Sequence, residues 1–152
     1  MKTFLKIIAI IAVVIILLSV AGYYFVVKPG ISMYTEGKTY SQNVVNVVTN
    51  SWNVSDLKTY GSQELITSLD KDSKSINLVF DKFKKNLGKL KTPPDLQGKI
   101  SAFKTLNKTT ITLALSGEAV FEKGSGEVKI TVIKTDEGWK VLYFGVFSPL
   151  LI

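Results

Sequence analysis

The chain has 152 residues and a net charge of +7, it contains no Cys and no His, and all 19 of its basic residues are Lys. The lack of Cys excludes disulfides, thiolate metal sites, thiol nucleophiles and a lipoprotein cysteine, and the lack of His removes the commonest general base and metal ligand. Lysine also lacks the planar fork of Arg, and the charge is weaker than the basic stripe of a nucleic-acid binder, so we predict no nucleic-acid partner, no metal and no cofactor.

An uncharged apolar run begins at Ile7 and ends at Val27. As a helix it would be about 31 Å long, which matches the roughly 30 Å hydrocarbon core of a bilayer. Tyr23 and Tyr24 stand at its far end, and aromatic rings prefer the headgroup level there. The run therefore predicts that residues 1–28 form a signal anchor with one transmembrane helix.

A cleaved signal peptide is the alternative interpretation of this segment. Ser19-Val20-Ala21 has the small-x-small pattern of a cleavage site, and cleavage would fall after Ala21. The apolar run continues past that site to Val27, which favours the anchor. Lysines flank both ends of the run, so the orientation depends on the short, signal-like N-terminal tail. That layout predicts a cytoplasmic N-terminus and an extracytoplasmic domain.

A linker is predicted at residues 29–35, followed by one α+β domain at residues 36–152. Thr39 and Gln42 have the spacing of a capping box at the start of a helix. The apolar face of this helix follows the helical period and consists of Tyr40, Val44, Val47, Val48 and Trp52.

Two short helices and one longer helix are expected next. Ser55 and Ser62 are the predicted N-caps of helices at residues 56–60 and 63–69. Residues 70–75 are expected to form a polar link. A longer helix with the period of an amphipathic face should then begin at Ile76 and end near Gly88.

The remaining residues predict a curved antiparallel sheet of about four strands, at residues 98–106, 109–123, 128–132 and 139–147. Gly117 indicates a bend or bulge in the second strand. Hairpin turns are expected at Gly124-Ser125-Gly126 and at Asp136-Glu137-Gly138.

The last strand is apolar on both faces, as in a strand that is covered on both sides or lies in an interface. Strict alternation places Trp139, Val141, Tyr143 and Phe147 on one face, and Leu142, Phe144 and Val146 on the other. We expect Trp139 to close one end of the core against the helix that carries Phe80 and Phe83.

The order of helices followed by a β-meander resembles the nuclear-transport-factor-2-like fold, a cystatin-like α+β cone. The resemblance covers residues 36–149 and depends on the helix from Tyr40 to Trp52 and on three short motifs. The motifs are Phe121-Glu122-Lys123-Gly124-x-Gly126, Asp136-Glu137-Gly138-Trp139-Lys140-Val141 and Phe147-Ser148. This superfamily includes isomerases, dehydratases, ligand-binding proteins and membrane-anchored secretion-system components, so the resemblance does not decide the function.

No catalytic, cofactor-binding or metal-binding residues are predicted. The sequence favours a membrane-anchored, exported, non-catalytic binding or assembly module that meets a protein partner or a second copy of itself. A small-ligand-binding or isomerase-like cone is the alternative, and it would need a deep pocket with a buried carboxylate. The candidate ligand or partner contacts are Trp52, Tyr60, Trp139, Tyr143 and Phe147.

A lysine stripe on the predicted longer helix is a candidate for contact with lipid headgroups. Lys82, Lys85 and Lys89 share one helical stripe. An ordinary solvated helix face explains the same pattern and is the favoured interpretation.

Overall fold

The computed structural model describes residues 14–21 and 28–152, which divide into two compact units, residues 1–36 and 37–152. Residues 14–21 are helical. The predicted anchor at residues 7–27 lies for the most part outside the described residues. Among the residues that are described, no helix is both long enough and apolar enough to cross a membrane.

The prediction of a linker at residues 29–35 is wrong, because helix α2 extends over Lys28–Ser51. Proline is tolerated in the first turn of a helix, where its missing N–H has no helical partner, so Pro29 starts the helix. Thr39 therefore lies inside α2 and caps nothing. Ser41 and Thr49 are buried polar residues in this helix, and each hydroxyl donates to the carbonyl four residues earlier, over 2.7 and 2.6 Å.

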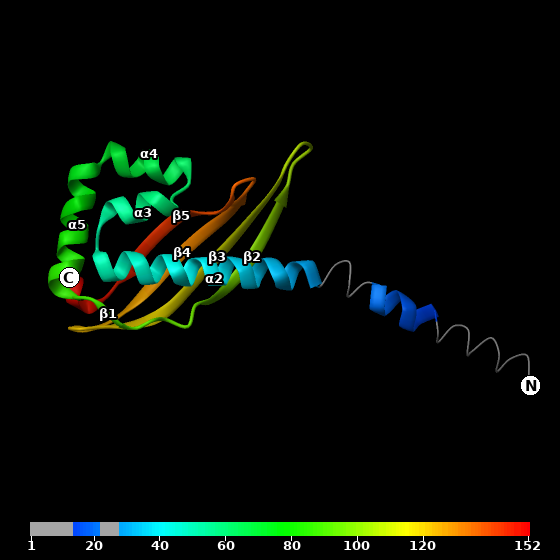
Figure 1. Cartoon of the computed structure of the whole chain (residues 1–152), viewed down its shortest axis with the longest axis horizontal. Coiled ribbons are helices and arrows are strands. Elements are labelled where there is room, and N and C mark those ends of the chain that lie inside the picture. Colours follow the sequence, from blue (N-terminus) through cyan, green and yellow to red (C-terminus); the bar gives the residue numbers. More distant parts are fainter. Residues whose placement is uncertain (1–13, 22–27) are drawn as a thin grey trace, which may run out of the picture. The chain divides into compact units, whose positions relative to one another are not determined.

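Three shorter helices follow α2 (Figure 1). Helix α3 spans Val54–Tyr60 and is capped by Asn53, two residues before the predicted cap Ser55. Helix α4 spans Gln63–Lys71, and the Ser62 side chain caps it as predicted. Helix α5 spans Ser73–Asn86, so the expected polar link at residues 70–75 is helical except for Asp72, which forms the turn between α4 and α5. Gly88 follows its end with a φ of 73°, which confirms the predicted stop.

The described residues contain an antiparallel sheet of five strands, which confirms the α+β class and adds a short first strand to the prediction. In this sheet β3 pairs with β4 and β4 with β5, and both β1 and β2 lie beside β3. The strands are β1 Leu90–Thr92, β2 Gln97–Lys104, β3 Thr109–Phe121, β4 Gly124–Thr135 and β5 Gly138–Phe147.

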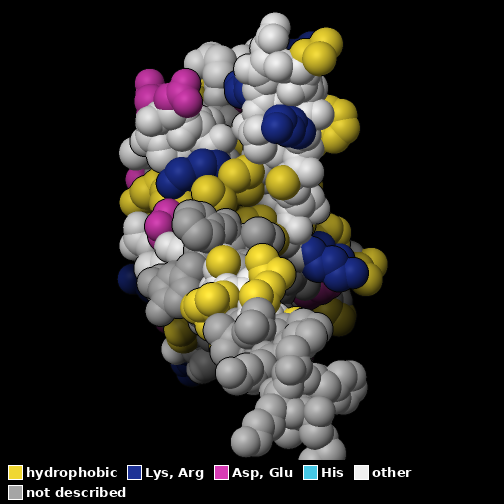
Figure 2. Space-filling view, turned by 90° about the vertical axis from the view of Figure 1, so that its right-hand side faces the viewer, with side chains coloured by type: hydrophobic (Ala, Val, Ile, Leu, Met, Phe, Trp, Pro, Cys, Tyr) yellow, Lys and Arg dark blue, Asp and Glu magenta, His cyan; other side chains and the backbone are white. Residues whose placement is uncertain are grey.

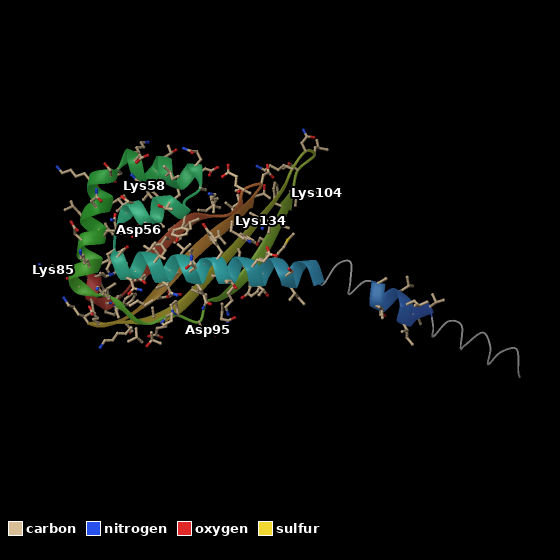
Figure 3. The ribbon with its side chains drawn as sticks, viewed as in Figure 1. Asp56, Lys58, Lys85, Asp95, Lys104 and Lys134 are labelled. Carbon is tan, nitrogen blue, oxygen red and sulfur yellow. The ribbon has the colours of Figure 1, made fainter. Side chains whose placement is uncertain are left out.

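Gly117 forms neither the bend nor the bulge that was expected, because the β3–β4 register is continuous past it. The segment before β2 passes close to this glycine, and a Cβ there would lie 2.7 Å from the Asp95 carbonyl oxygen. Lys38 of α2 holds the same segment with a 2.9 Å ion pair to Asp95 (Figure 3), and its hydrogen bond lowers the pKa of that carboxyl. Gly117 is therefore a point of close packing.

The first hairpin turn also differs from the prediction. Phe121 pairs with Gly124, so Glu122 and Lys123 form a two-residue turn and the glycines belong to β4. The second turn is at the predicted place, because Thr135 pairs with Gly138. Gly138 has a φ of 114°, a conformation that favours glycine.

The predicted faces of the last strand are wrong, because β5 contains a bulge. Thr131 pairs with Tyr143 but Val132 pairs with Val141, which leaves Leu142 without a partner residue. One extra residue reverses the alternation of side chains beyond it. Val141 and Val146 are consequently both buried, whereas Tyr143 and Phe147 lie on the opposite face.

The core of the unit at residues 37–152 lies between α2 and one face of the sheet (Figure 1). Both elements contribute side chains with no exposed area. Those of α2 are Val44, Val45 and Val48, and those of the sheet include Leu113, Ala119, Val128, Val132 and Val141.

Candidate functional site

The interior of the domain is packed with apolar side chains and offers no catalytic site. Every Asp and Glu in the described part of the chain is exposed or half-exposed. The same residues hold no cluster of three or more Asp or Glu side chains that could bind a metal ion. The isomerase-like alternative requires a buried carboxylate, so the described interior gives it no support.

The best candidate for a functional surface is the face of the sheet opposite the core, which we call the outer face. Its residues alternate with the buried ones along β3 and β4, and no described element buries it. It consists of Gln97, Lys99, Ser101 and Phe103 of β2, Thr110, Thr112, Ala114, Ser116, Glu118 and Val120 of β3, Ser125, Glu127, Lys129, Thr131 and Ile133 of β4, and Lys140, Tyr143, Gly145 and Phe147 of β5.

Two aromatic side chains dominate one side of the outer face. Tyr143 is 46% exposed and Phe147 is 51% exposed. Gly145 lies between them, and a Cβ there would lie 2.6 Å from the Tyr143 hydroxyl oxygen. The Lys129 ammonium lies 5.0 Å from the centre of the Phe147 ring and 3.2 Å from a Glu127 carboxylate oxygen. This side of the sheet therefore combines apolar rings with charges of both signs.

Two shallow hollows adjoin these aromatic residues and share Glu127 in their walls. The first, of about 400 Å³, runs across β2, β3, β4 and β5 as far as Tyr143. The second, of about 480 Å³, lies between Phe147 and the C-terminal residues Pro149, Leu151 and Ile152. Both are open, as expected for a surface that meets a larger partner.

The structure separates the other predicted contact residues from this face. Trp52 and Trp139 are buried, and each belongs to a different part of the core. Tyr60 is half-buried at the end of α3, where its ring lies 6.1 Å from that of Tyr40. Of the five predicted contact residues, only Tyr143 and Phe147 share an exposed surface.

The expected contact of Trp139 with Phe80 and Phe83 is wrong, because Trp52 occupies that position. The Trp52 ring centre lies 6.4 Å from Phe80 and 5.2 Å from Phe83. Trp139 lies instead beside Gly37 of α2. Trp139 is the second residue of β5 and pairs with Lys134, so the start of this strand lies beside Gly37 of α2.

Tyr40 is not suited to acid–base chemistry near neutral pH. The Tyr40 hydroxyl donates to the Tyr60 carbonyl oxygen over 3.0 Å. Burial, and to a lesser extent the charge of Tyr60, raises the pKa of Tyr40 to about 12. The phenol therefore stays protonated and holds α3 against α2.

The predicted headgroup contacts Lys82, Lys85 and Lys89 lie on or just after α5, near the C-terminal end of the chain. The Lys82 ammonium donates to the Leu151 carbonyl oxygen, and the Lys85 carbonyl accepts from the Lys123 ammonium. Their possible contact with lipid stays a prediction.

Sequence reasoning missed the polar residues of the outer face that surround the aromatic pair. Glu127, Lys129 and Thr131 alternate with the buried Val128, Ile130 and Val132 along β4. That alternation could have identified them as one surface. Their position beside Tyr143 and Phe147 depends on the β5 bulge, which the sequence pattern does not reveal.

No known protein family model matches the chain, and comparison with curated proteins and with solved structures also finds no match. The resemblance to the nuclear-transport-factor-2-like fold therefore stays a prediction.

Proposed function

We propose that this protein is a single-pass membrane protein whose exported domain is a non-catalytic binding or assembly module. In this proposal the segment from Ile7 to Val27 is the anchor, the domain is extracytoplasmic, and its fold is that of a membrane-anchored nuclear-transport-factor-2-like cone. The outer face meets a protein partner or a second copy of the chain. The observation that carries the proposal is the exposed pair of aromatic rings, Tyr143 and Phe147, on an uncovered sheet face.

Several features of the outer face support this proposal. Aromatic side chains are enriched in protein interfaces, where they often supply much of the binding energy. Leu151 and Ile152 line the hollow beside Phe147 and extend its apolar surface. Lys129 and Glu127 provide charges of both signs next to the rings, which suits recognition of a polar rim on a partner.

We expect a photoreactive amino acid in place of Phe147 to form a covalent adduct when the full-length chain is in its native membrane. The same group in place of Leu78, which is 63% exposed on α5, is the matched control and should give little adduct. The double substitution Tyr143→Ser and Phe147→Ser should weaken the association at least tenfold, because two central aromatic contacts are lost. A chain that stays monomeric and forms no adduct from position 147 would contradict the proposal.

The anchor has a separate test. If the apolar run spans a bilayer, the full-length protein should stay with membranes after a carbonate wash and keep its original N-terminus. N-terminal sequencing of the membrane fraction checks this. A soluble product that begins at Gly22 would show cleavage after Ala21 and would support the signal-peptide alternative.

A further inference from the structure

Helix α2 and strand β3 run side by side in the same direction within the unit at residues 37–152. Gly37 lies against Leu113, since a Cβ there would lie 2.6 Å from that leucine's Cδ2. Further along, the rings of Trp52 and Phe121 have centres 5.7 Å apart. The helix rises about 22 Å and the strand about 26 Å between these contacts, so the two elements run in the same general direction, although α2 crosses the strands obliquely (Figure 1). The start of β3 therefore lies at the end where α2 enters the domain.

The β2–β3 hairpin projects from this same end, and its tip is apolar and basic. Lys104 pairs with Thr109, and the Thr105 amide closes the turn by donating to the Lys108 carbonyl oxygen over 2.8 Å. Phe103 is 70% exposed, and Leu106 is fully exposed at the tip. Figure 2 views this end of the molecule, and apolar and Lys side chains lie together at its top.

Leu106 at the tip also extends beyond the neighbouring turn at Asp136 and Glu137. Ile111 pairs with Lys134, so the turn at Asp136 and Glu137 is level with about residue 109 of β3. Lys104 pairs with Thr109, so Leu106 lies about two residues further along the hairpin, or roughly 7 Å. Lys104 and Lys108 are the charged residues next to the tip, and Lys108 also lines a hollow with Glu64, Asp136 and Glu137.

We propose that the β2–β3 hairpin tip inserts into the headgroup layer of an anionic bilayer, with Phe103 and Leu106 entering the interface and Lys104 and Lys108 meeting lipid phosphates. This inference rests on the proposed membrane anchor. An exposed aromatic ring and leucine flanked by lysines have the chemistry that binds an anionic membrane surface.

The lengths of the segments allow this contact. Ten residues separate Val27 from Gly37, and a helix covers them in about 15 Å. Leu113 pairs with Ile100, and the hairpin continues six residues from Ile100 to Leu106, which is about 20 Å of strand. The hairpin can therefore span the distance from the domain to a bilayer that holds the anchor.

The lysine stripe of α5 is less suited to this contact. Lys85 lies at the end of the domain far from the hairpin, whereas Lys104 lies on β2 toward the tip (Figure 3). Helix α5 packs Phe80 and Phe83 on Trp52, which directly follows the last residue of α2. The hairpin lies instead at the end of the domain that holds Gly37, the first residue of this unit.

The absence of Cys from the chain allows a clean test with a single label. The Leu106→Cys variant of the full chain carries an environment-sensitive fluorophore and is reconstituted in vesicles of 30% phosphatidylglycerol in phosphatidylcholine. Ser125→Cys is the matched control, because Ser125 is exposed and pairs with Val120 at the other end of β3. Quenching by nitroxide lipids is measured for both variants, and flotation shows that each is in the membrane.

The label at position 106 should be quenched at least threefold more strongly than the label at position 125. Adding Lys104→Glu and Lys108→Glu, or using phosphatidylcholine alone, should remove most of this difference. Equal quenching at positions 106 and 125 in a chain that floats with the vesicles would overturn the hairpin contact and leave the anchor intact. Failure to float would overturn the anchor and the hairpin contact together.

Discussion

Replacing Trp52 with Ala is expected to lower the free energy of unfolding of the domain by about 3–5 kcal/mol, the range for a large aromatic residue removed from a core. The ring lies within 6.4 Å of Phe80, Phe83 and Phe121, and its Nε1 donates to the Gly88 carbonyl oxygen over 2.7 Å. The substitution leaves a cavity between α2, α5 and β3 and a buried carbonyl without its donor. A typical domain is stable by about 5–15 kcal/mol, so the loss is large.

The backbone of Trp52 adds to the reason for this effect. Its φ is 48°, a left-handed conformation that a bulky residue rarely adopts. The surrounding contacts of the ring hold this conformation at the end of α2, and the Trp52 amide still donates to the Val48 carbonyl over 2.8 Å. Alanine keeps the unfavourable backbone and loses the contacts that compensate it.

Urea unfolding of residues 29–152, followed by far-ultraviolet circular dichroism, measures this loss. Trp52→Phe is the informative companion variant, because it keeps most of the ring but leaves the Gly88 carbonyl unpaired. We expect it to cost about 2 kcal/mol. A loss below about 1 kcal/mol for Trp52→Ala would contradict the view that this ring joins the helices to the sheet.

Local patterns predict much of this fold. Period-two alternation located β3 closely and the middle of β4, and the Ser62 cap and the Gly88 stop marked helix ends correctly. These features depend on neighbouring residues alone, so the sequence carries them directly. The α+β class follows from their order.

Features that depend on distant segments were not predictable in the same way. Gly117 looks like a strand breaker, yet its role is to admit the segment at Asp95, which lies on another element. No glycine or proline at Leu142 marks the bulge in the sequence. The bulge reverses the face of the sheet on which Tyr143 lies. The candidate site therefore contains the predicted Tyr143 and Phe147 but with neighbours that the alternation had placed elsewhere.

The two tryptophans show the same limit in the core. Both were expected to be large apolar residues with either a structural or a binding role, and burial makes the structural role the better one for each. Periodicity could not decide which of them meets Phe80 and Phe83. That choice depends on the direction of α2 across the sheet, which places Trp52 near α5 and Trp139 near Gly37.

Replacing Trp139 with Ala is also expected to cost about 3–5 kcal/mol of unfolding free energy, but its conservative variant should behave differently. The Trp139 ring is buried beside Gly37, where a Cβ would lie 3.1 Å from its Cζ2, and the Lys134 ammonium lies 5.3 Å from the ring centre. Within the described part of the chain, the Trp139 Nε1 is buried without a hydrogen-bond acceptor. Phenylalanine removes this unpaired donor.

Trp139→Phe should therefore cost about 1 kcal/mol or less, against about 2 kcal/mol for Trp52→Phe, although both variants shrink an indole to a phenyl ring. The same urea titration on the four variants measures the contrast. Equal losses for the two Phe variants would show that the indole N–H of Trp139 is satisfied in solution. A loss below about 1 kcal/mol for Trp139→Ala would place the ring at the surface, where it would join the candidate partner contacts of the domain.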